Sequence, residues 1–273
     1  LLIDFDPDRF LAALRQIPHA RVRLVSRPAA EKALAVAEML AMIDASNQTY
    51  QLNLAEAYLE WGDKGTDDAP KKLEQFTYSL TIARQLSATN PNNVRFLMAM
   101  IRAEDRIGRL YLRLGKEHCE DQKTAQISFQ NALPHCRALW HLTEQRLALE
   151  PENYIARRSI IVAQVNLSEA LRANHQPEEA LNFAAKALAG MQKIAAADPH
   201  NIEAQTDLTE VLQTVGECYL VIGKTSLALR AWHEAEQLLV ALIARDHTNE
   251  ELKTLLKKVR AKMKSWERTH PAC

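Results

Sequence analysis

Four arginines in the middle of the sequence have a spacing that could do chemistry. Arg102, Arg106, Arg109 and Arg113 are separated by four, three and four residues, so they form one stripe if this segment is a helix. A guanidinium group can hold a carboxylate through two parallel hydrogen bonds, and the stripe could therefore bind acidic groups of a partner. The alternative is a solvated helix face on which neighbouring acidic residues neutralise part of the charge.

A second set of residues has the side chains of a metal site, namely His118, Cys119, His135, Cys136 and His141. Two ligands on one helix need a spacing of three or four residues, whereas His135 and His141 are six apart, and the set matches no common zinc pattern. Cys136 can equally be a small buried residue. Serine and cysteine occur in no nucleophile motif, and no glycine cluster could cradle a phosphate. We therefore expect no metal, no cofactor and no enzymatic activity.

The charge of the chain argues against two classes of partner. Its 34 Lys and Arg balance 34 Asp and Glu, so there is no global attraction to nucleic acid or to an anionic membrane. No apolar run approaches the roughly 20 residues that span a bilayer. The arginine stripe is the one feature that favours a nucleic-acid-binding helical repeat, and we keep that function as one alternative. The four cysteines show no CxxC spacing, and a reducing, cytoplasmic setting is the simplest expectation.

The elements that must position these side chains are helices. Ala, Leu, Glu, Arg, Lys and Gln dominate, glycine occurs only 7 times, and no stretch alternates apolar and polar residues as a half-buried strand does. A short tetrad begins with an acid or amide and ends three places later with Asn. It recurs at intervals of 46, 60, 48 and 48 residues, with first residues Asp44, Asn90, Glu150, Asp198 and Asp246. Recurrence of this kind indicates a repeat protein.

The unit that begins at Asp198 is the most regular. Asp198 at the N-cap and Pro199 at the first helical position predict a helix start, and Gly223 suits a left-handed residue at the helix end. A second helix follows at once and ends near Asp246. Two helices joined by so short a turn are antiparallel, and each pair is apolar on both sides, so it needs another pair above and below it. This arrangement is a helical solenoid.

The first helix of every unit carries the same pattern. A large apolar residue precedes a small one, an aromatic residue or Leu follows three places later, and a turn residue stands four places after that. The small residues are Ala55, Gly108, Ser168 and Gly216, and the turn residues are Gly62, Gly115, His175 and Gly223. We expect the small residues to let the second helix cross closely.

This pattern resembles the tetratricopeptide repeat (TPR). Val215-Gly216-Glu217-Cys218-Tyr219, followed by Ala228, Trp232 and Ala235, matches the order and spacing of the TPR consensus, and Ser168, Ala180 and Ala187 repeat the offsets one unit earlier. The resemblance covers residues 44–260 and departs in its period, which exceeds the usual value of about 34 residues, so the helices should be longer by about two turns. Such long units look like those in TPR regions of bacterial signalling proteins, including kinases and STAND-type NTPases.

The resemblance implies an all-α, right-handed α-solenoid of about four to five antiparallel helix pairs with a C-terminal capping helix. Residues 1–25 would be an N-terminal cap or the tail of a preceding domain. Residues 26–247 would be the repeats (26–46 partial, 47–89, 90–149, 150–197 and 198–245), and residues 246–273 the capping helix and tail. The second unit is longer than its neighbours around 116–130, either as a protruding corner or as a longer helical connection. Pro134 should start or kink the second helix of that unit.

The resemblance also implies a function and a site. The scaffold would be non-enzymatic and bind a protein or peptide on its concave face, where arginines at one end and acids at the other would orient an extended peptide. The candidate groove residues are Arg102, Asp105, Arg109, Arg113, Glu169, Arg172, Gln213 and Glu217. In the alternative, the chain is the sensor or regulatory C-terminal region of a larger kinase or STAND-type NTPase, which the missing initiator Met and the unpaired helix at 26–43 favour. The terminal helices could also join two copies of the chain.

Overall fold

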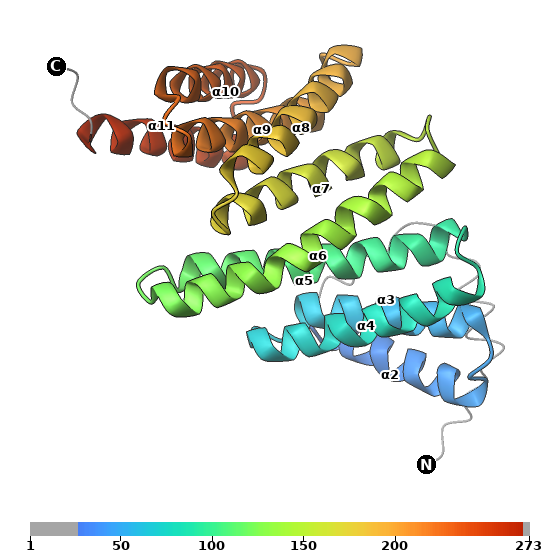
Figure 1. The fold of residues 1–273 in the computed structure, drawn as a ribbon. Helices are drawn as coiled ribbons and strands as arrows, with labels where there is room; N and C mark the ends of the chain where they lie inside the picture. Colours follow the sequence, from blue (N-terminus) through green and yellow to red (C-terminus); the bar gives the residue numbers. More distant parts are fainter. Residues whose placement is uncertain (1–26, 270–273) are drawn as a thin grey trace.

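The computed structural model describes residues 27–269, with side chains to residue 265. Within this range the chain forms ten helices and no strand, and each helix packs against its neighbours in the chain (Figure 1). The helices are α2 (Arg27–Ile43), α3 (Gln48–Lys64), α4 (Ala69–Thr89), α5 (Val94–Glu117), α6 (Gln122–Leu149), α7 (Tyr154–Ala173), α8 (Pro177–Ala197), α9 (Ile202–Val221), α10 (Thr225–Arg245) and α11 (Glu250–Thr269). The expected all-α solenoid of helix pairs is confirmed.

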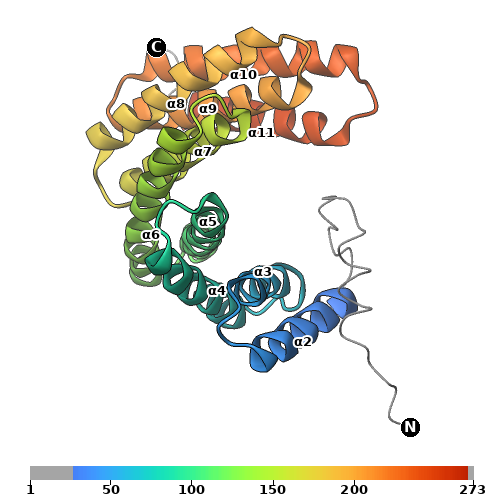
Figure 2. The same ribbon diagram turned by 90° about the vertical axis from the view of Figure 1, so that its right-hand side faces the viewer.

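The helix pairs are arranged in an arc. Figure 2 shows α3, α5, α7 and α9 toward the inner side of the arc and α4, α6, α8 and α10 toward its outer side. Successive inner helices also contact one another, from α3 to α5, from α5 to α7 and from α7 to α9. The first helix of each pair therefore contributes to one continuous concave face.

Each recurring tetrad is a turn that joins one pair to the next. The backbone N–H of the final Asn donates to the carbonyl of the first residue in all five, for example at 3.1 Å from Asn201 to Asp198. The Asn side chain then accepts from backbone N–H groups of the following helix, as Asn153 does from Ile155 and Ala156. The prediction that Asp198 is an N-cap was wrong. Asp198 accepts from the His200 N–H inside the turn, and Asn201 caps α9.

The turns within the helix pairs fall into two kinds. Gly223 has a φ of 75° and His175 a φ of 59°, and both stand just beyond the end of a helix, as expected. Gly62 and Gly115 are not turn residues, because α3 and α5 continue past them. A Cβ atom at Gly115 would lie 2.4 Å from the ring of Phe129, so this glycine allows close approach of two helices.

The extra length of the second unit lies in its helices. Helix α5 has 24 residues and α6 has 28, and only residues 118–121 connect them, so the extra residues are helical, as in the alternative of a longer helical connection. Pro134 does not start α6, because that helix begins at Gln122 and Pro134 lies inside it. Its ring is exposed to solvent. Helix α6 changes direction along its course in Figure 1, which agrees with the expected kink.

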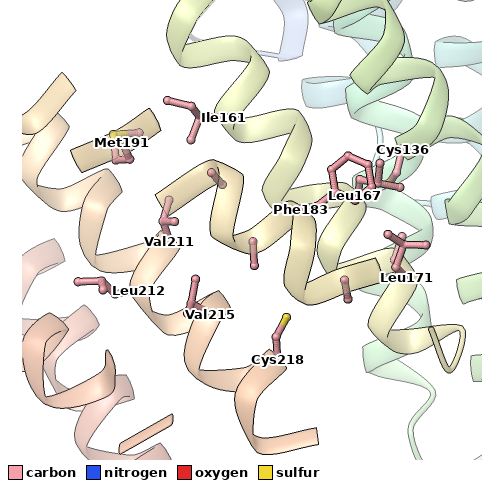
Figure 3. Packing of buried hydrophobic residues seen from close by; sticks show 14 of the residues in the cluster. Cys136, Ile161, Leu167, Leu171, Phe183, Met191, Val211, Leu212, Val215 and Cys218 are labelled. Atoms are coloured by element: carbon pink, nitrogen blue, oxygen red, sulfur yellow. The ribbon is translucent and has the colours of Figure 1, made fainter. Parts of the chain in front are cut away.

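The largest core cluster joins the middle repeats. The cluster includes Leu167 and Leu171 of α7, Phe183 of α8, and Leu212 and Val215 of α9, whose side chains are drawn in Figure 3. The expected close crossings occur at the small residues of the template. The Ser168 hydroxyl donates to the Ala180 carbonyl at 2.8 Å, and the space that a Cβ would take at Gly216 is filled by the indole of Trp232. Such contacts leave little tolerance for added volume.

The two ends of the chain differ in what the structure describes. The N-terminal cap or domain tail that we expected at residues 1–25 lies outside the described residues. Helix α11 covers the far end of the solenoid, where Leu252, Val259 and Met263 are buried against α10. Among residues 27–269, none of the helices combines the length and the apolar character that crossing a membrane requires.

Candidate functional site

The concave face contains a groove between α5, α7, α9 and α11. Its volume is about 910 Å³, and it reaches α3 and α4 at its N-terminal end. Partly exposed apolar side chains line it, including Val162 and Val165 of α7 and Leu255 of α11. Charged side chains surround these apolar residues. An open channel that crosses four helices suits an extended chain better than a compact small molecule.

The structure brings most of the predicted site residues together. Arg109, Arg113, Glu169, Gln213 and Glu217 line the groove. Arg102 and Asp105 line a smaller cavity of about 500 Å³ beside it, together with residues at the start of α7. Arg172 lines neither cavity and is held by Glu217, with 2.8 Å between Nη2 and Oε2. Seven of the eight predicted residues therefore line two adjoining hollows on one face, and Arg172 lies outside both.

Ion pairs connect the inner helices across this face, beginning at the N-terminal end. Arg102 of α5 contacts Glu56 of α3 at 2.7 Å, and Arg106 of α5 contacts Asp63 of α3 at 2.9 Å. Half of the arginine stripe therefore binds to the preceding repeat. The alternative of a face neutralised by neighbouring acids holds only in part here. Arg106 also contacts Asp105 of its own helix at 3.0 Å, but both arginines pair with acids more than 40 positions away in the sequence.

The same kind of pairing continues toward the C-terminal end. Lys116 of α5 pairs with Glu169 of α7, and Arg158 of α7 pairs with Asp207 of α9 at 2.5 Å. Glu217 of α9 forms an ion pair with Lys262 of α11, with 2.5 Å between Oε1 and Nζ, in addition to its pair with Arg172. We call this series of ion pairs between inner helices the concave ladder. Exposed pairs of this kind contribute little individually, about 0–1 kcal/mol, but together they fix where the charges of the face are neutralised.

Arg109 and Arg113 do not belong to the concave ladder. Among the described side chains, their ion-pair partners lie on their own helix, Asp105 at 3.8 Å and Glu117 at 3.5 Å, and both distances exceed that of an ordinary hydrogen bond. The side chain of Arg109 is 61% exposed and that of Arg113 is 52% exposed. These two guanidinium groups are therefore accessible to a ligand in the groove.

One acidic side chain of the groove also stands outside the concave ladder. Glu210 of α9 is accessible from the groove, but the surrounding walls desolvate it, and this raises the pKa of its carboxyl group. The neighbouring charge of Asp207 raises that pKa further, whereas Arg109 and Arg158 oppose the shift. Negative charge is thus disfavoured at the position of Glu210 itself.

Several groove residues were missed by the sequence analysis. Lys258 and Lys262 lie four residues apart on α11, which was interpreted only as a capping helix, although this spacing places both on one face. Arg158 lies four residues before Val162 on α7, so extending the template backward by one helical turn could have found it. No comparable signal pointed to Lys116, because its groove position depends on the extra length of α5.

The residues with metal-ligand chemistry do not converge. His135 Nδ1 lies 2.6 Å from Glu104 Oε2, Cys136 is buried against Gly108, and the exposed His118 contacts the Leu114 carbonyl. Among the described residues, no group of three His, Cys, Asp or Glu side chains could hold a metal ion. Burial and nearby carboxylates raise the pKa of the Cys136 thiol to about 12, which disfavours its thiolate form.

Comparison with known proteins identifies likenesses of structure. No protein-family model matches the sequence, and no curated protein matches it. The crystal structure of BtubC (BKLC) from P. vanneervenii is similar over 92% of this chain and 95% of that one, with a TM-score of 0.50 and 14% sequence identity. TTC0263, a thermophilic TPR protein in Thermus thermophilus, is similar over 86% of this chain and 92% of that one, with a TM-score of 0.44 and 13% identity. At such identities the likeness concerns the fold and not the activity.

Proposed function

We propose that this chain, which has a TPR-like α-solenoid fold, is a non-enzymatic scaffold that binds an extended segment of another protein in its concave groove. The observation that supports this most strongly is the open groove across α5, α7, α9 and α11, in which accessible arginines stand beside partly exposed apolar side chains. Such a mixture provides both apolar contact and charged hydrogen bonds, which is the composition of a protein-binding surface.

The arrangement of the groove favours an extended ligand. Each of the four helices contributes side chains to one channel, so a ligand must cross the helices to contact all of them. An extended segment presents side chains alternately to either side and can place them between successive helices. Arg109 and Arg113 are accessible, and Arg side chains are enriched among the residues that contribute most to binding.

Site-specific photo-crosslinking in cells tests this proposal. A photoreactive residue replaces Val165 or Thr214, which line the groove, and in a matched control it replaces Arg230, an exposed residue of the outer helix α10. We expect a discrete crosslinked protein from the two groove positions and none from position 230. Crosslinks from position 230 alone, with none from the groove, would show that partners bind another face.

A further inference from the structure

We infer that the groove selects an acidic protein segment whose negative side chains are interspersed with apolar ones. This inference rests on the proposed function, because it specifies the ligand of the same groove. It starts from charge: eight cationic and five acidic side chains line the groove, although the whole chain has a net charge of zero. The groove therefore has an excess of positive charge, although the chain as a whole has none.

Four of the groove cations are already neutralised by groove acids. Arg106 pairs with Asp63, Lys116 with Glu169, Arg158 with Asp207 and Lys262 with Glu217. These pairs belong to the concave ladder and connect successive repeats. A ligand gains little from them, because it would have to displace an acid that is already in place.

The other four cations are available to a ligand. They are Lys72, Arg109, Arg113 and Lys258, whereas Glu210 is the one groove acid outside the concave ladder among the described residues. Lys72 donates to the backbone carbonyl of Asp63 at 3.5 Å, and Lys258 is exposed. Exposed cations outside the concave ladder focus the electrostatic field along a concave surface and attract negatively charged groups.

The position of these cations defines the pattern of the ligand. Lys72 of α4 and the two arginines of α5 lie toward the N-terminal end of the groove, and Lys258 extends from α11 at the other end. Between them lie Val162 and Val165 of α7 and the desolvated Glu210 of α9. A segment that contacts both ends must therefore place carboxylates at the ends and apolar side chains over the middle.

A protein segment fits this pattern better than a nucleic acid does. Every nucleotide carries a phosphate, so a strand that crosses the groove would place negative charge beside Glu210, Asp207 and Glu217. The aromatic side chain that lines the groove, Phe76 of α4, is 3% exposed and offers no platform for stacking bases, and Val162 and Val165 line the middle. An acidic polypeptide can omit negative charge where the groove is acidic or apolar.

Fluorescence anisotropy with the whole chain tests the inference. The probe is a labelled peptide of about twelve residues that carries Glu near both ends and Val and Ser in its middle, a length suited to an extended groove ligand. Matched peptides carry Gln or Lys in place of Glu, and a single-stranded RNA of similar length is the nucleic-acid comparison. We expect the Glu peptide to bind at least about tenfold more tightly than the Gln peptide, more weakly as salt increases, and more tightly than the RNA.

Variants assign the binding to the groove. The double substitution Arg109→Gln and Arg113→Gln removes two accessible charges without reversing them, and Lys258→Gln removes the charge at the opposite end. We expect both variants to bind the Glu peptide several-fold more weakly, whereas the exposed outer-face substitution Arg230→Gln leaves binding unchanged. Circular dichroism confirms that each variant retains its helix content.

Three results would overturn the inference: equal binding of the Glu and Gln peptides, tighter binding of the Lys peptide or the RNA, or Glu-peptide binding that the groove substitutions do not change. These results are distinguishable from failure of the proposed function. If photo-crosslinking at Val165 still captures a partner while the Glu peptide does not bind, the groove is a protein-binding site for a segment of different chemistry. If both experiments fail, the proposed function fails as well.

Discussion

At the scale of the residue, a buried carboxylate connects several helices. Glu104 of α5 is 1% exposed, accepts a hydrogen bond from Arg84 of α4 at 2.8 Å, and contacts His135 of α6 at 2.6 Å. A buried carboxylate needs such partners, because an unsatisfied one retains its full desolvation cost. Three helices of two adjacent pairs are thus joined at one side chain.

Removing His135 alone should lower the stability of the protein more than removing His135 and the Glu104 carboxylate together. We predict that His135→Ala destabilises the protein by about 2 kcal/mol, because Glu104 Oε2 loses its partner while it stays buried. Adding Glu104→Leu should recover about half of this loss. Urea denaturation measures both, and His141→Ala, at an exposed position of the same helix, should change stability by less than about 0.5 kcal/mol. A double variant less stable than His135→Ala would contradict the prediction.

Three exposed aspartates provide a residue-level prediction for pH. The pKa values of Asp44, Asp121 and Asp246 are lowered chiefly by hydrogen bonds from the hydroxyls of Ser46, Thr124 and Thr248. A lowered pKa contributes stability that is present above the unfolded-state value of about 3.9 and is lost as pH falls through the folded-state value. Melting temperature below about pH 4 should therefore fall less steeply in the triple Asp→Asn variant than in the parent chain. Parallel curves would exclude this contribution.

At the scale of the element, much of the fold follows from short sequence signals. The Asn residues of the tetrads and the small residues at Ala55, Gly108, Ser168 and Gly216 specified the turns and close crossings. Helix boundaries were less predictable. Gly62 and Gly115 look like turn residues, but the rings of Phe76 and Phe129 occupy the space of their missing side chains, so their role depends on partners in the next helix.

Pro134 provides the clearest test at the element scale. It has no N–H to donate to the carbonyl of Gln130, and proline inside a helix costs about 3 kcal/mol relative to alanine. Its ring is exposed, so replacing it disturbs no core packing. We predict that Pro134→Ala stabilises the protein by about 1–2 kcal/mol, with part of the gain offset by the bent path that α6 must keep between its neighbours.

The measurement is a comparison of urea midpoints. Asn131→Ala, at another exposed position of α6, is the matched control and should add no more than about 0.7 kcal/mol, because it changes only helix propensity. A lower midpoint for Pro134→Ala than for the parent chain would mean that the kink is required for packing against α5 and α7.

At the scale of the whole molecule, the site was less predictable than the fold. The TPR template placed Arg109, Gln213 and Glu217 on the groove, because groove positions recur with the helical period. It gave no indication that Arg102, Arg106 and Arg172 would be held by acids of neighbouring repeats. Those pairings depend on how far each helix pair rotates against the next, which is a property of the complete arc (Figure 2).

The same dependence on nearest neighbours limits how far a disturbance travels along the arc. Glu217 of α9 joins two members of the concave ladder, since it receives Arg172 from α7 and Lys262 from α11. Among the described helices, α11 makes extensive contact only with α10. Its attachment therefore depends on few interactions beyond its buried Leu252 and Val259. Local opening free energy is expected to be low for such a terminal element.

We therefore predict that Glu217→Gln loosens the C-terminal end and leaves the N-terminal repeats unchanged. Loss of the Lys262 ion pair should weaken the attachment of α11 by about 0.5–1 kcal/mol, which corresponds to roughly two- to fivefold faster amide exchange in residues 250–265. Exchange in α3–α5 should not change, because stability in a solenoid is a sum of nearest-neighbour terms. Hydrogen exchange detected by mass spectrometry measures both regions in one sample. Faster exchange that extends to α3 would instead show that the ten helices open as a single cooperative unit.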